Sequence, residues 1–318
     1  MSQRAPLPPP PTDNSDSNSD SDDSPDSTSL LSNLQSLHLP PNPLRLHDPP
    51  TTPFEFHRNF ISQSKPALFK SGGIFPSISP EYRTLTSLTP LISSTPLSIN
   101  ITPSHGKGDY IDSGRFIKPY ESTMSFSEFT KSLFPNLKNT QTDKPVYYLS
   151  SQNSNLSHLP INLPTPLQLN EAFSKQPEAV NIWIGDGRAY TTCHRDVFEN
   201  VYVVCEGVKR FRIAPPYLKK YLEVETCTNC SFNSNLEIIL DDETPVKWIS
   251  NDLKSLQSNP TLSPFIYEID VREGEVLYLP FGWFHEVESV GINVSYNWWF
   301  DGEYDLKWTL MELIDLGI

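Results

Sequence analysis

The residues with the clearest chemical potential are His194 and Asp196, which stand two positions apart, and His285, which follows 91 residues after the first of them. Two histidines and one carboxylate form the facial triad that binds Fe(II) on one side and leaves the opposite positions open for a cosubstrate and O2. On a strand, side chains two residues apart point to the same face, so His194 and Asp196 can hold one ion together. This pattern points to metal-dependent oxygenation as the class of reaction.

The third ligand must come from a neighbouring strand. His285 meets this requirement because it follows a predicted strand at Val276–Leu279 and a Pro-Phe-Gly turn. None of the other five histidines has a carboxylate two residues later. A His-x-Asp pair is frequent by chance, and alone it indicates a hydrogen-bonded pair at the start of a strand. The metal interpretation therefore depends on further residues.

Lys209 is the first of these further residues. Its alternation partners Phe211 and Ile213 are apolar, so this face of a strand is predicted to be buried, with Arg210 and Arg212 facing water. A lysine inside an apolar barrel is costly unless it meets an anion. The alternative is an exposed lysine on a basic strand.

In the buried arrangement, Lys209 would pair with a carboxylate of a bound molecule. The hydroxyl groups of Thr191 and Tyr148 could add neutral donors to the same carboxylate. This set predicts a site for a carboxylate group of a bound molecule.

The cysteines carry a weaker signal. Cys227 and Cys230 have the C-x-x-C spacing, but with no second pair or nearby histidine they cannot form a tetrahedral zinc site. We interpret them as an incidental loop feature. Four cysteines are too few and too unevenly spaced for a disulfide framework, which favours a reducing compartment.

The charge balance bears on the partner. The formal charge of the 318 residues is −14, and residues 1–28, with six aspartates and one arginine, account for −5 of it. The remaining −9 disfavours binding to a phosphate backbone and favours a basic peptide or protein.

The beginning of the chain, residues 1–43, is rich in Pro, Ser and Asp and is predicted to be a disordered tail. It has no basic start followed by an apolar run, so no secretory signal is expected. No apolar run reaches the roughly 18 residues that would span a membrane. We expect a cytoplasmic or nuclear protein, or both.

Residues 44–318 are predicted to form the ordered domain, beginning with an α+β part at 44–175. Alternation predicts strands at 66–69, 97–101 and 146–149. A short helix is expected near residues 53–60, and Ser125 is placed to cap a second one over 125–133.

Residues 176–300 are predicted to form the barrel core, and many short strands with little helix favour an antiparallel jelly roll. Strands are expected at 180–184, 198–204, 208–213, 276–279 and 292–300, and the second and third would form a hairpin through Cys205-Glu206-Gly207. Residues 218–262 are interpreted as an irregular insertion. Within the C-terminal part, 301–318, apolar residues at helical spacing predict a helix that caps the barrel or meets a partner helix.

Four sequence blocks together resemble the JmjC-domain 2-oxoglutarate oxygenases, in the small cupin-like subgroup. They are Asn181-Ile-Trp-Ile-Gly, His194-Arg-Asp-Val-Phe-Glu-Asn-Val-Tyr, Gly274-Glu-Val-Leu-Tyr-Leu-Pro-Phe-Gly-Trp-Phe-His285 and Asn297-Trp-Trp-Phe-Asp-Gly-Glu-Tyr-Asp-Leu-Lys. The resemblance runs from about Pro53 to Asp315. Within the family it is strongest to peptidyl-lysyl hydroxylases of developmentally regulated GTP-binding proteins.

The resemblance implies a double-stranded β-helix (jelly-roll, cupin) barrel whose C-terminal helix often forms a homodimer. It implies Fe(II) at the two histidines and the aspartate, with 2-oxoglutarate and O2 as cosubstrates. The residues that match family positions are His194, Asp196 and His285 for the metal, Lys209, Thr191, Tyr148, Asn200 and Asn297 for 2-oxoglutarate, and Trp299 for the wall near the substrate. The alternative for Trp299 is a core residue.

By the same resemblance, the expected function is hydroxylation of a protein side chain, a lysine of a translation-associated GTPase, with succinate and CO2 as coproducts. A tRNA-base hydroxylase of the related small JmjC type is the first alternative, and the negative charge counts against it. The second is a catalytically silent cupin-like binding module, which the intact triad disfavours.

Overall fold

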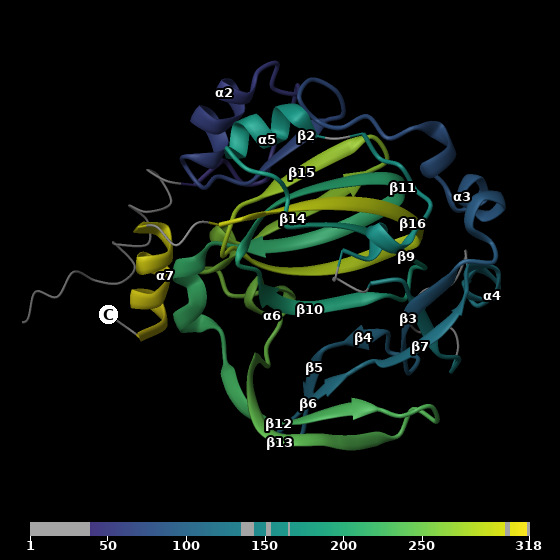
Figure 1. Cartoon of the computed structure of the whole chain (residues 1–318). Coiled ribbons are helices and arrows are strands. Elements are labelled where there is room, and N and C mark those ends of the chain that lie inside the picture. The colour runs from purple at the N-terminus through teal and green to yellow at the C-terminus, as the bar shows by residue number, and fades with distance from the viewer. Residues whose placement is uncertain (1–38, 135–142, 151–153, 165, 303–305, 317–318) are drawn as a thin grey trace, which may run out of the picture. The chain divides into compact units, whose positions relative to one another are not determined.

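The computed structural model describes residues 39–134, 143–150, 154–164, 166–302 and 306–316 (Figure 1). The predicted tail therefore lies outside the described residues except for residues 39–43. The strands are β1 (Leu46–His47), β2 (Ala67–Lys70), β3 (Pro96–Thr102), β4 (Lys107–Gly108), β5 (Tyr110–Asp112), β6 (Arg115–Lys118), β7 (Tyr120–Ser125), β8 (Val146–Tyr148), β9 (Ala179–Gly185), β10 (Tyr190–Arg195), β11 (Phe198–Ala214), β12 (Val224–Phe232), β13 (Ile238–Ile249), β14 (Tyr267–Arg272), β15 (Glu275–Leu279) and β16 (Phe284–Asp301).

The helices are short and lie mainly before the sheet core. They are α2 (Pro53–Phe56), the π-helix η1 (His57–Ile61), α3 (Leu85–Ile92), α4 (Phe126–Lys131), α5 (Leu167–Phe173), α6 (Leu253–Leu256) and α7 (Leu306–Leu316), with 3-10 turns η2 (Pro80–Tyr82), η3 (Asn155–His158), η4 (Pro216–Tyr221) and η5 (Ser263–Phe265). Of the described helices, none is long and apolar enough to cross a membrane.

Two long strands, β11 and β16, run antiparallel along their whole length and organise the main sheet. The first half of β11 lies between β15 and the second half of β16, which pairs on its other edge with β9. The second half of β11 lies between β14 and the first half of β16, which pairs with β10. The two halves thus form two layers (Figure 1). This arrangement confirms the predicted mainly β jelly-roll fold, although the described strands run from β1 to β4 without closing into a complete barrel.

The space between the layers holds an apolar cluster that explains why the strands alternate. Side chains from both halves of β11, among them Val204 and Phe211, meet Trp183 of β9 and Trp299 of β16. A second, larger cluster packs the outer face of the first layer against α2, α3 and α5. The core therefore lies on both sides of the layer that carries β9.

The predicted hairpin at Cys205-Glu206-Gly207 is wrong. The two segments are halves of the single strand β11, because β16 lies beside both of them and takes the hydrogen bonds that a hairpin would have used. Gly207 has φ +75° at a β-bulge, where a Cβ atom would lie 2.1 Å from the carbonyl oxygen of Ile292. A glycine with positive φ is required here for a bend between layers and not for a turn.

The interpretation of residues 218–262 as irregular is also wrong. Nearly half of this segment forms β12 and β13, an antiparallel ribbon that joins β6 and β5 in a four-stranded sheet. Both faces of much of β13 are exposed, so its side chains show no alternation of apolar and polar residues. The cysteines of the C-x-x-C pair are buried in β12 as free thiols.

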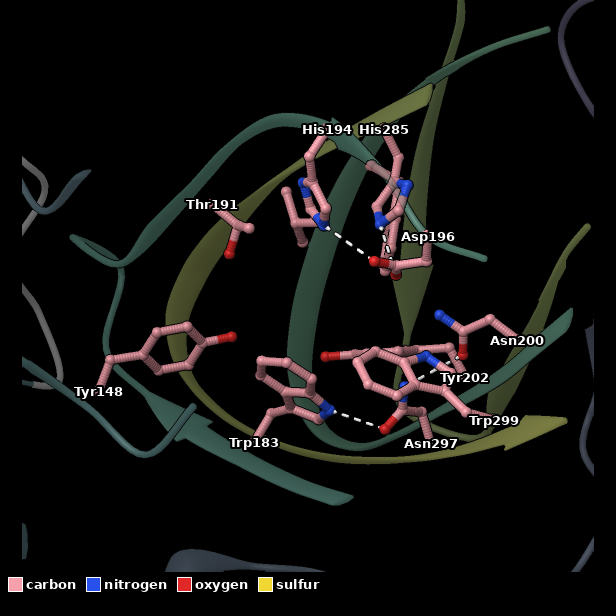
Figure 2. A pocket seen from close by; sticks show the side chains of 12 residues that line it. Tyr148, Trp183, Thr191, His194, Asp196, Asn200, Tyr202, His285, Asn297 and Trp299 are labelled. Atoms are coloured by element: carbon pink, nitrogen blue, oxygen red, sulfur yellow. Dashed lines mark hydrogen bonds and ion pairs between the residues drawn. The ribbon is translucent and has the colours of Figure 1, made fainter. Parts of the chain in front are cut away.

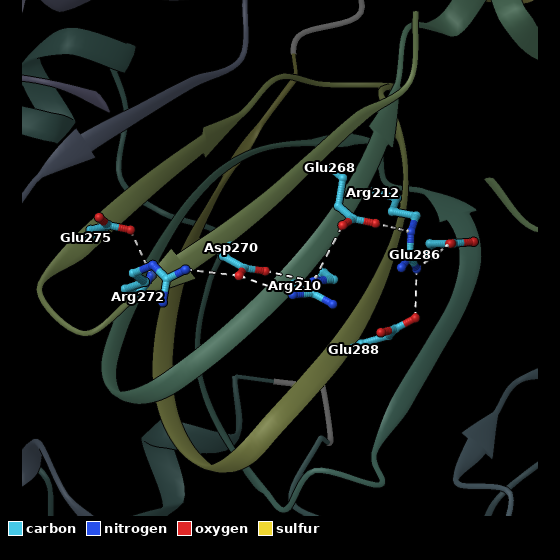
Figure 3. Close-up of polar contacts among 8 residues, drawn as sticks. All are labelled: Arg210, Arg212, Glu268, Asp270, Arg272, Glu275, Glu286 and Glu288. Atoms are coloured by element: carbon cyan, nitrogen blue, oxygen red, sulfur yellow. Dashed lines mark hydrogen bonds and ion pairs between the residues drawn. The ribbon is translucent and has the colours of Figure 1, made fainter. Parts of the chain in front are cut away.

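The predicted exposure of Arg212 is the third correction. Its guanidinium is only 4% exposed and pairs with Glu268, Glu286 and Glu288 at 2.8, 3.1 and 2.7 Å (Figure 3). Glu286 is fully buried and also accepts the backbone N–H of Leu253, in α6. The segment between β11 and β14 therefore covers the strand face that the alternation assigned to water.

The elements predicted before the core agree with the structure. Ser125 caps α4 in a capping box with Glu128, and β3 pairs with β7 and β8 in a separate three-stranded sheet. At the other end, Leu306, Leu310 and Leu313 of α7 are 83%, 58% and 39% exposed. The predicted apolar stripe of α7 therefore faces outward.

Candidate metal centre

Three predicted metal ligands meet at one place. His194 lies near the end of β10, Asp196 follows that strand, and His285 is the second residue of β16. The antiparallel register sets His194 directly opposite His285. One ligand atom from each of the three side chains lies within 4.8 Å of the others (Figure 2). Asp196 supplies the short connection, with carboxylate oxygens 3.8 Å from Nε2 of His194 and 3.6 Å from Nε2 of His285.

The backbone selects which nitrogen of each imidazole faces the centre. Nδ1 of His194 lies 2.8 Å from the carbonyl of Thr192, and Nδ1 of His285 lies 3.1 Å from the carbonyl of Trp283. A carbonyl only accepts, so both Nδ1 atoms donate and the two Nε2 atoms keep their lone pairs. Such outer hydrogen bonds orient metal-binding histidines and raise their basicity.

The electrostatics favour neutral ligands. Burial, with a further contribution from His194, lowers the pKa of His285 to about 4, so its imidazole is uncharged near neutral pH. Metal ions bind the neutral form. The three side chains therefore provide two imidazole lone pairs and one carboxylate, the donor set of a facial triad.

Next to this cluster is a cavity of about 380 Å³, its open mouth included. Apart from Lys209, every site residue predicted from the sequence lines this cavity: His194, Asp196, His285, Thr191, Tyr148, Asn200, Asn297 and Trp299. Residues from β8, β10, β11 and β16 are thus brought together from positions up to 151 apart along the chain.

Lys209 lies directly behind the cavity wall, 1% exposed. Its Nζ donates to the hydroxyl of Tyr148 and to Oγ of Ser289, each at 2.8 Å, and lies 4.6 Å from the centre of the Tyr148 ring. Within the described chain no carboxylate pairs with it. Burial alone lowers the pKa of Lys209 to about 7. A buried ammonium whose partners are all neutral is the state expected of a site that receives an anion.

The amide side chains form the floor of the cavity. Asn297 accepts from Nε1 of Trp183 at 3.0 Å and from Asn181 at 3.2 Å, and it donates to Asn200 at 3.2 Å (Figure 2). This series of hydrogen bonds fixes the orientation of Asn200 and Asn297, both predicted from the sequence. It also leaves them with few free hydrogen-bonding positions for a ligand.

Trp299 forms the remaining wall. Its ring stacks on Phe198 at 5.1 Å with an interplanar angle of 6°, and it is 5% exposed. Its Nε1–H is buried and has no acceptor among the described residues. An acceptor atom of a bound molecule would satisfy it.

Several contributing residues escaped the sequence analysis. Ser289, four positions after His285 on the same face of β16, could have been found from the strand period. Trp248 could not, because it lies on β13, in the segment interpreted as irregular. Its ring is nearly parallel to that of His194 at 6.2 Å, and its Nε1 donates to Thr192 at 3.3 Å.

Comparison with known proteins gives a consistent picture. The cupin-like domain family matches residues 53–306. The human bifunctional peptidase and (3S)-lysyl hydroxylase JMJD7 is 32% identical over 282 residues, which cover 84% of this chain and 87% of that protein. The lysine-specific demethylase JMJ32 of Arabidopsis thaliana is 29% identical over 300 residues, covering 84% of each chain. The JmjC domain-containing protein E of Dictyostelium discoideum is 27% identical over 308 residues, 83% of this chain and 85% of that protein.

Proposed function

The chain belongs to the cupin-like family of JmjC dioxygenases, and on that premise we propose that it hydroxylates a lysine side chain of a protein substrate with Fe(II), 2-oxoglutarate and O2. Succinate and CO2 are the coproducts. One observation carries the proposal: the cluster of His194, Asp196 and His285 lies beside the same cavity as Lys209, which is buried and has no carboxylate partner among the described residues.

The residues fit both groups. The two Nε2 lone pairs and the Asp196 carboxylate hold Fe(II), and the ammonium of Lys209 pairs with the distal carboxylate of 2-oxoglutarate. Tyr148 and Thr191 line the same wall and supply hydroxyl groups to that carboxylate. When bound, the metal and cosubstrate supply the oxidation itself.

The tasks of the protein are then orientation and exclusion of water. The carbonyls of Thr192 and Trp283 fix the imidazoles, and the amide chain through Asn297 holds the cavity floor rigid. The aromatic rings of Trp183 and Trp299 provide apolar surface in the cavity between its polar side chains. These residues would orient the bound groups, and the chemistry that the metal and cosubstrate would supply requires no acid or base from the protein.

The substrate class rests on two supporting facts. The human relative carries lysyl hydroxylase in its name, and the chain outside its first 28 residues has a charge of −9, which suits a basic peptide. We propose a lysine of a translation-associated GTPase as the target, in the cytoplasm or nucleus.

The test is succinate formation from 2-oxoglutarate under O2 with added Fe(II), followed by mass spectrometry of lysine peptides from GTP-binding proteins. We expect iron-dependent turnover, a peptide mass gain of one oxygen, and loss of both in His194→Ala. The matched control is His158→Ala, an exposed histidine outside the cluster, which should keep full activity. Activity that persists in a folded His194→Ala variant would refute the assignment of the metal ligands.

Three other outcomes identify other functions. Loss of a methyl group from methyl-lysine, without stable oxygen gain, would indicate demethylation, as in the name of the Arabidopsis relative. Oxygen gain on a modified tRNA base would indicate the nucleic-acid alternative. Tight 2-oxoglutarate binding without turnover, even with cell lysate as a source of substrate, would indicate a binding module.

A further inference from the structure

A second cavity, which we call the side cavity, adjoins the cavity beside the metal cluster. Tyr148, Trp183 and Thr191, which Figure 2 shows around the first cavity, also line the second, so the two cavities share one wall. The side cavity has a volume of about 450 Å³, open parts included, and its other lining residues include Asn100, Asp109, Ser150 and Tyr190. Asn100, Asp109 and Ser150 also line an open groove between β3, β7 and the β12–β13 ribbon. The side cavity therefore adjoins both the surface groove and the cavity beside the metal cluster.

Asp109 lines both the side cavity and the groove, and a single residue, Thr192, links it to His194 of the metal cluster. Its carbonyl accepts the hydroxyl of Thr192 at 2.5 Å, and the carbonyl of Thr192 accepts Nδ1 of His194 at 2.8 Å. The backbone of Asp109 is left-handed, with φ 53°, a conformation that aspartate and asparagine adopt more readily than other non-glycine residues. The strand that carries His194 thus holds the backbone of Asp109 in place.

The carboxylate of Asp109 has no hydrogen bond or ion pair within the described part of the chain. Other acidic groups of the groove are paired: Asp241 with Lys118 at 2.7 Å, and Glu121 with Ser98 at 2.5 Å. Burial raises the pKa of Asp109, and the charges of His194 and Lys118 only partly oppose this effect. A partly buried carboxylate without a partner costs free energy that an incoming cation would recover.

We propose that the Asp109 carboxylate receives the ammonium group of the substrate lysine, an inference that rests on the proposed function and adds the residue that selects its substrate class. The four-carbon stem of the lysine then packs along the aromatic wall of Tyr148 and Trp183, as such stems do on apolar surfaces. The charged head forms a charge-assisted hydrogen bond with Asp109.

This arrangement explains discrimination between side chains. A side chain of similar length without a charge, such as norleucine, leaves the Asp109 carboxylate partly buried and unpaired. Sites of this kind reject an analogue that lacks the polar group strongly, because the penalty falls on the protein group left without its partner. The Asp109 carboxylate is neither one of the three candidate metal ligands nor a partner of Lys209.

The experiment uses the full chain with Fe(II), 2-oxoglutarate and O2, and Asp109→Asn as the variant, because asparagine keeps both the shape and the left-handed backbone. Asp112→Asn is the control, since Asp112 is exposed and pairs with Arg115 at 2.8 Å. The probes are two synthetic peptide libraries with randomised flanks, one with a fixed central lysine and one with norleucine there. The readouts are oxygen gain by mass spectrometry, and succinate formed without any peptide.

We expect Asp109→Asn to lower kcat/KM for the lysine library by roughly 10- to 100-fold, mainly through KM, and to narrow its preference over norleucine. Peptide-free succinate formation and Fe(II) affinity should match those of the wild type and of Asp112→Asn. Unchanged lysine preference in active Asp109→Asn would overturn the inference and leave the proposed function standing. Loss of Fe(II) affinity would instead place Asp109 in the metal site and also overturn it.

Failure of the proposed function has a different signature. Wild type without iron-dependent succinate formation would show that the chain is no oxygenase, and the inference would fall with it. Wild type that forms succinate but oxidises neither library would exclude lysine as the substrate class and therefore Asp109 as its receptor.

Discussion

Lys209 should make the chain less stable in the absence of its cosubstrate, and Lys209→Met should therefore stabilise it. Burial lowers the pKa of Lys209 from 10.5 to about 7. At about 1.4 kcal/mol for each tenfold change in proton affinity, this displacement corresponds to a penalty on the order of 5 kcal/mol at pH 7. Methionine fills a similar volume without charge, but the hydroxyls of Tyr148 and Ser289 each lose a donor, at about 1 to 1.5 kcal/mol apiece. The net expectation is about 2 kcal/mol of added stability.

The pH dependence of this difference follows from the two protonation states. Below about pH 7 the folded and unfolded chains both hold the proton on Lys209, so the full penalty applies. Between about pH 7 and 10.5 only the unfolded chain binds it, so the stability of the wild type rises with pH relative to the variant. Two pH units remove about 3 kcal/mol, and the advantage of Lys209→Met should vanish or reverse slightly by pH 9.

The assay is urea unfolding at pH 7 and pH 9, with and without 2-oxoglutarate. At pH 7 the free energy of unfolding should be about 2 kcal/mol higher for the variant, which in a thermal melt corresponds to a Tm about 5 °C higher. Added 2-oxoglutarate should stabilise the wild type and leave Lys209→Met unchanged, because the variant lacks the cation. Lys70→Met is the control, since Lys70 is 59% exposed in a surface pair with Asp48. A variant that is less stable than the wild type at pH 7, or a difference that does not change by pH 9, would refute the reasoning.

Gly207→Ala should destabilise the fold by more than about 3 kcal/mol in urea unfolding, because the new Cβ would lie 2.1 Å from a backbone carbonyl oxygen. Gly114 has the same φ of +75° but nothing within 4 Å of the added Cβ, so Gly114→Ala should cost only about 1 kcal/mol. Equal losses would show that backbone strain alone is responsible. Tyr278→Phe removes the 2.6 Å hydrogen bond to the buried carboxylate of Glu199 and should cost about 1 to 3 kcal/mol by the same measurement. An unchanged stability would mean that the backbone N–H of Phe281, which also donates to this carboxylate, is sufficient for it. His285→Ala should lower Fe(II) affinity at least about 100-fold in anaerobic titration while the far-UV spectrum stays unchanged, and an unchanged affinity would remove it from the metal site.

The sequence predicted well wherever local pattern and tertiary environment agree. Ser125 and Glu128 form their capping box because both partners lie within one turn. The ligand cluster was predictable because strand alternation places His194 and Asp196 on one side, and a strand end with a turn delivers His285.

The errors arise where the deciding partner is far away in the chain. A hairpin turn and a bulge both need a residue with positive φ, and only the pairing of β11 with β16 decides which one Gly207 forms. Arg212 is buried because of three glutamates 56 to 76 residues away. No local pattern contains that information.

The order of the strands along the chain has a consequence for biosynthesis. β16 is synthesised after β9, β10 and β11, yet it forms hydrogen bonds with all three of them. Until it emerges, the nascent chain holds His194 and Asp196 without His285, and the apolar face of β11 lacks its partner. Strand pairings between residues far apart in the sequence, such as Asn181 with Asn297, form slowly, and apolar surface stays exposed until they form. A metal held by these three side chains could therefore bind only after β16 has been synthesised.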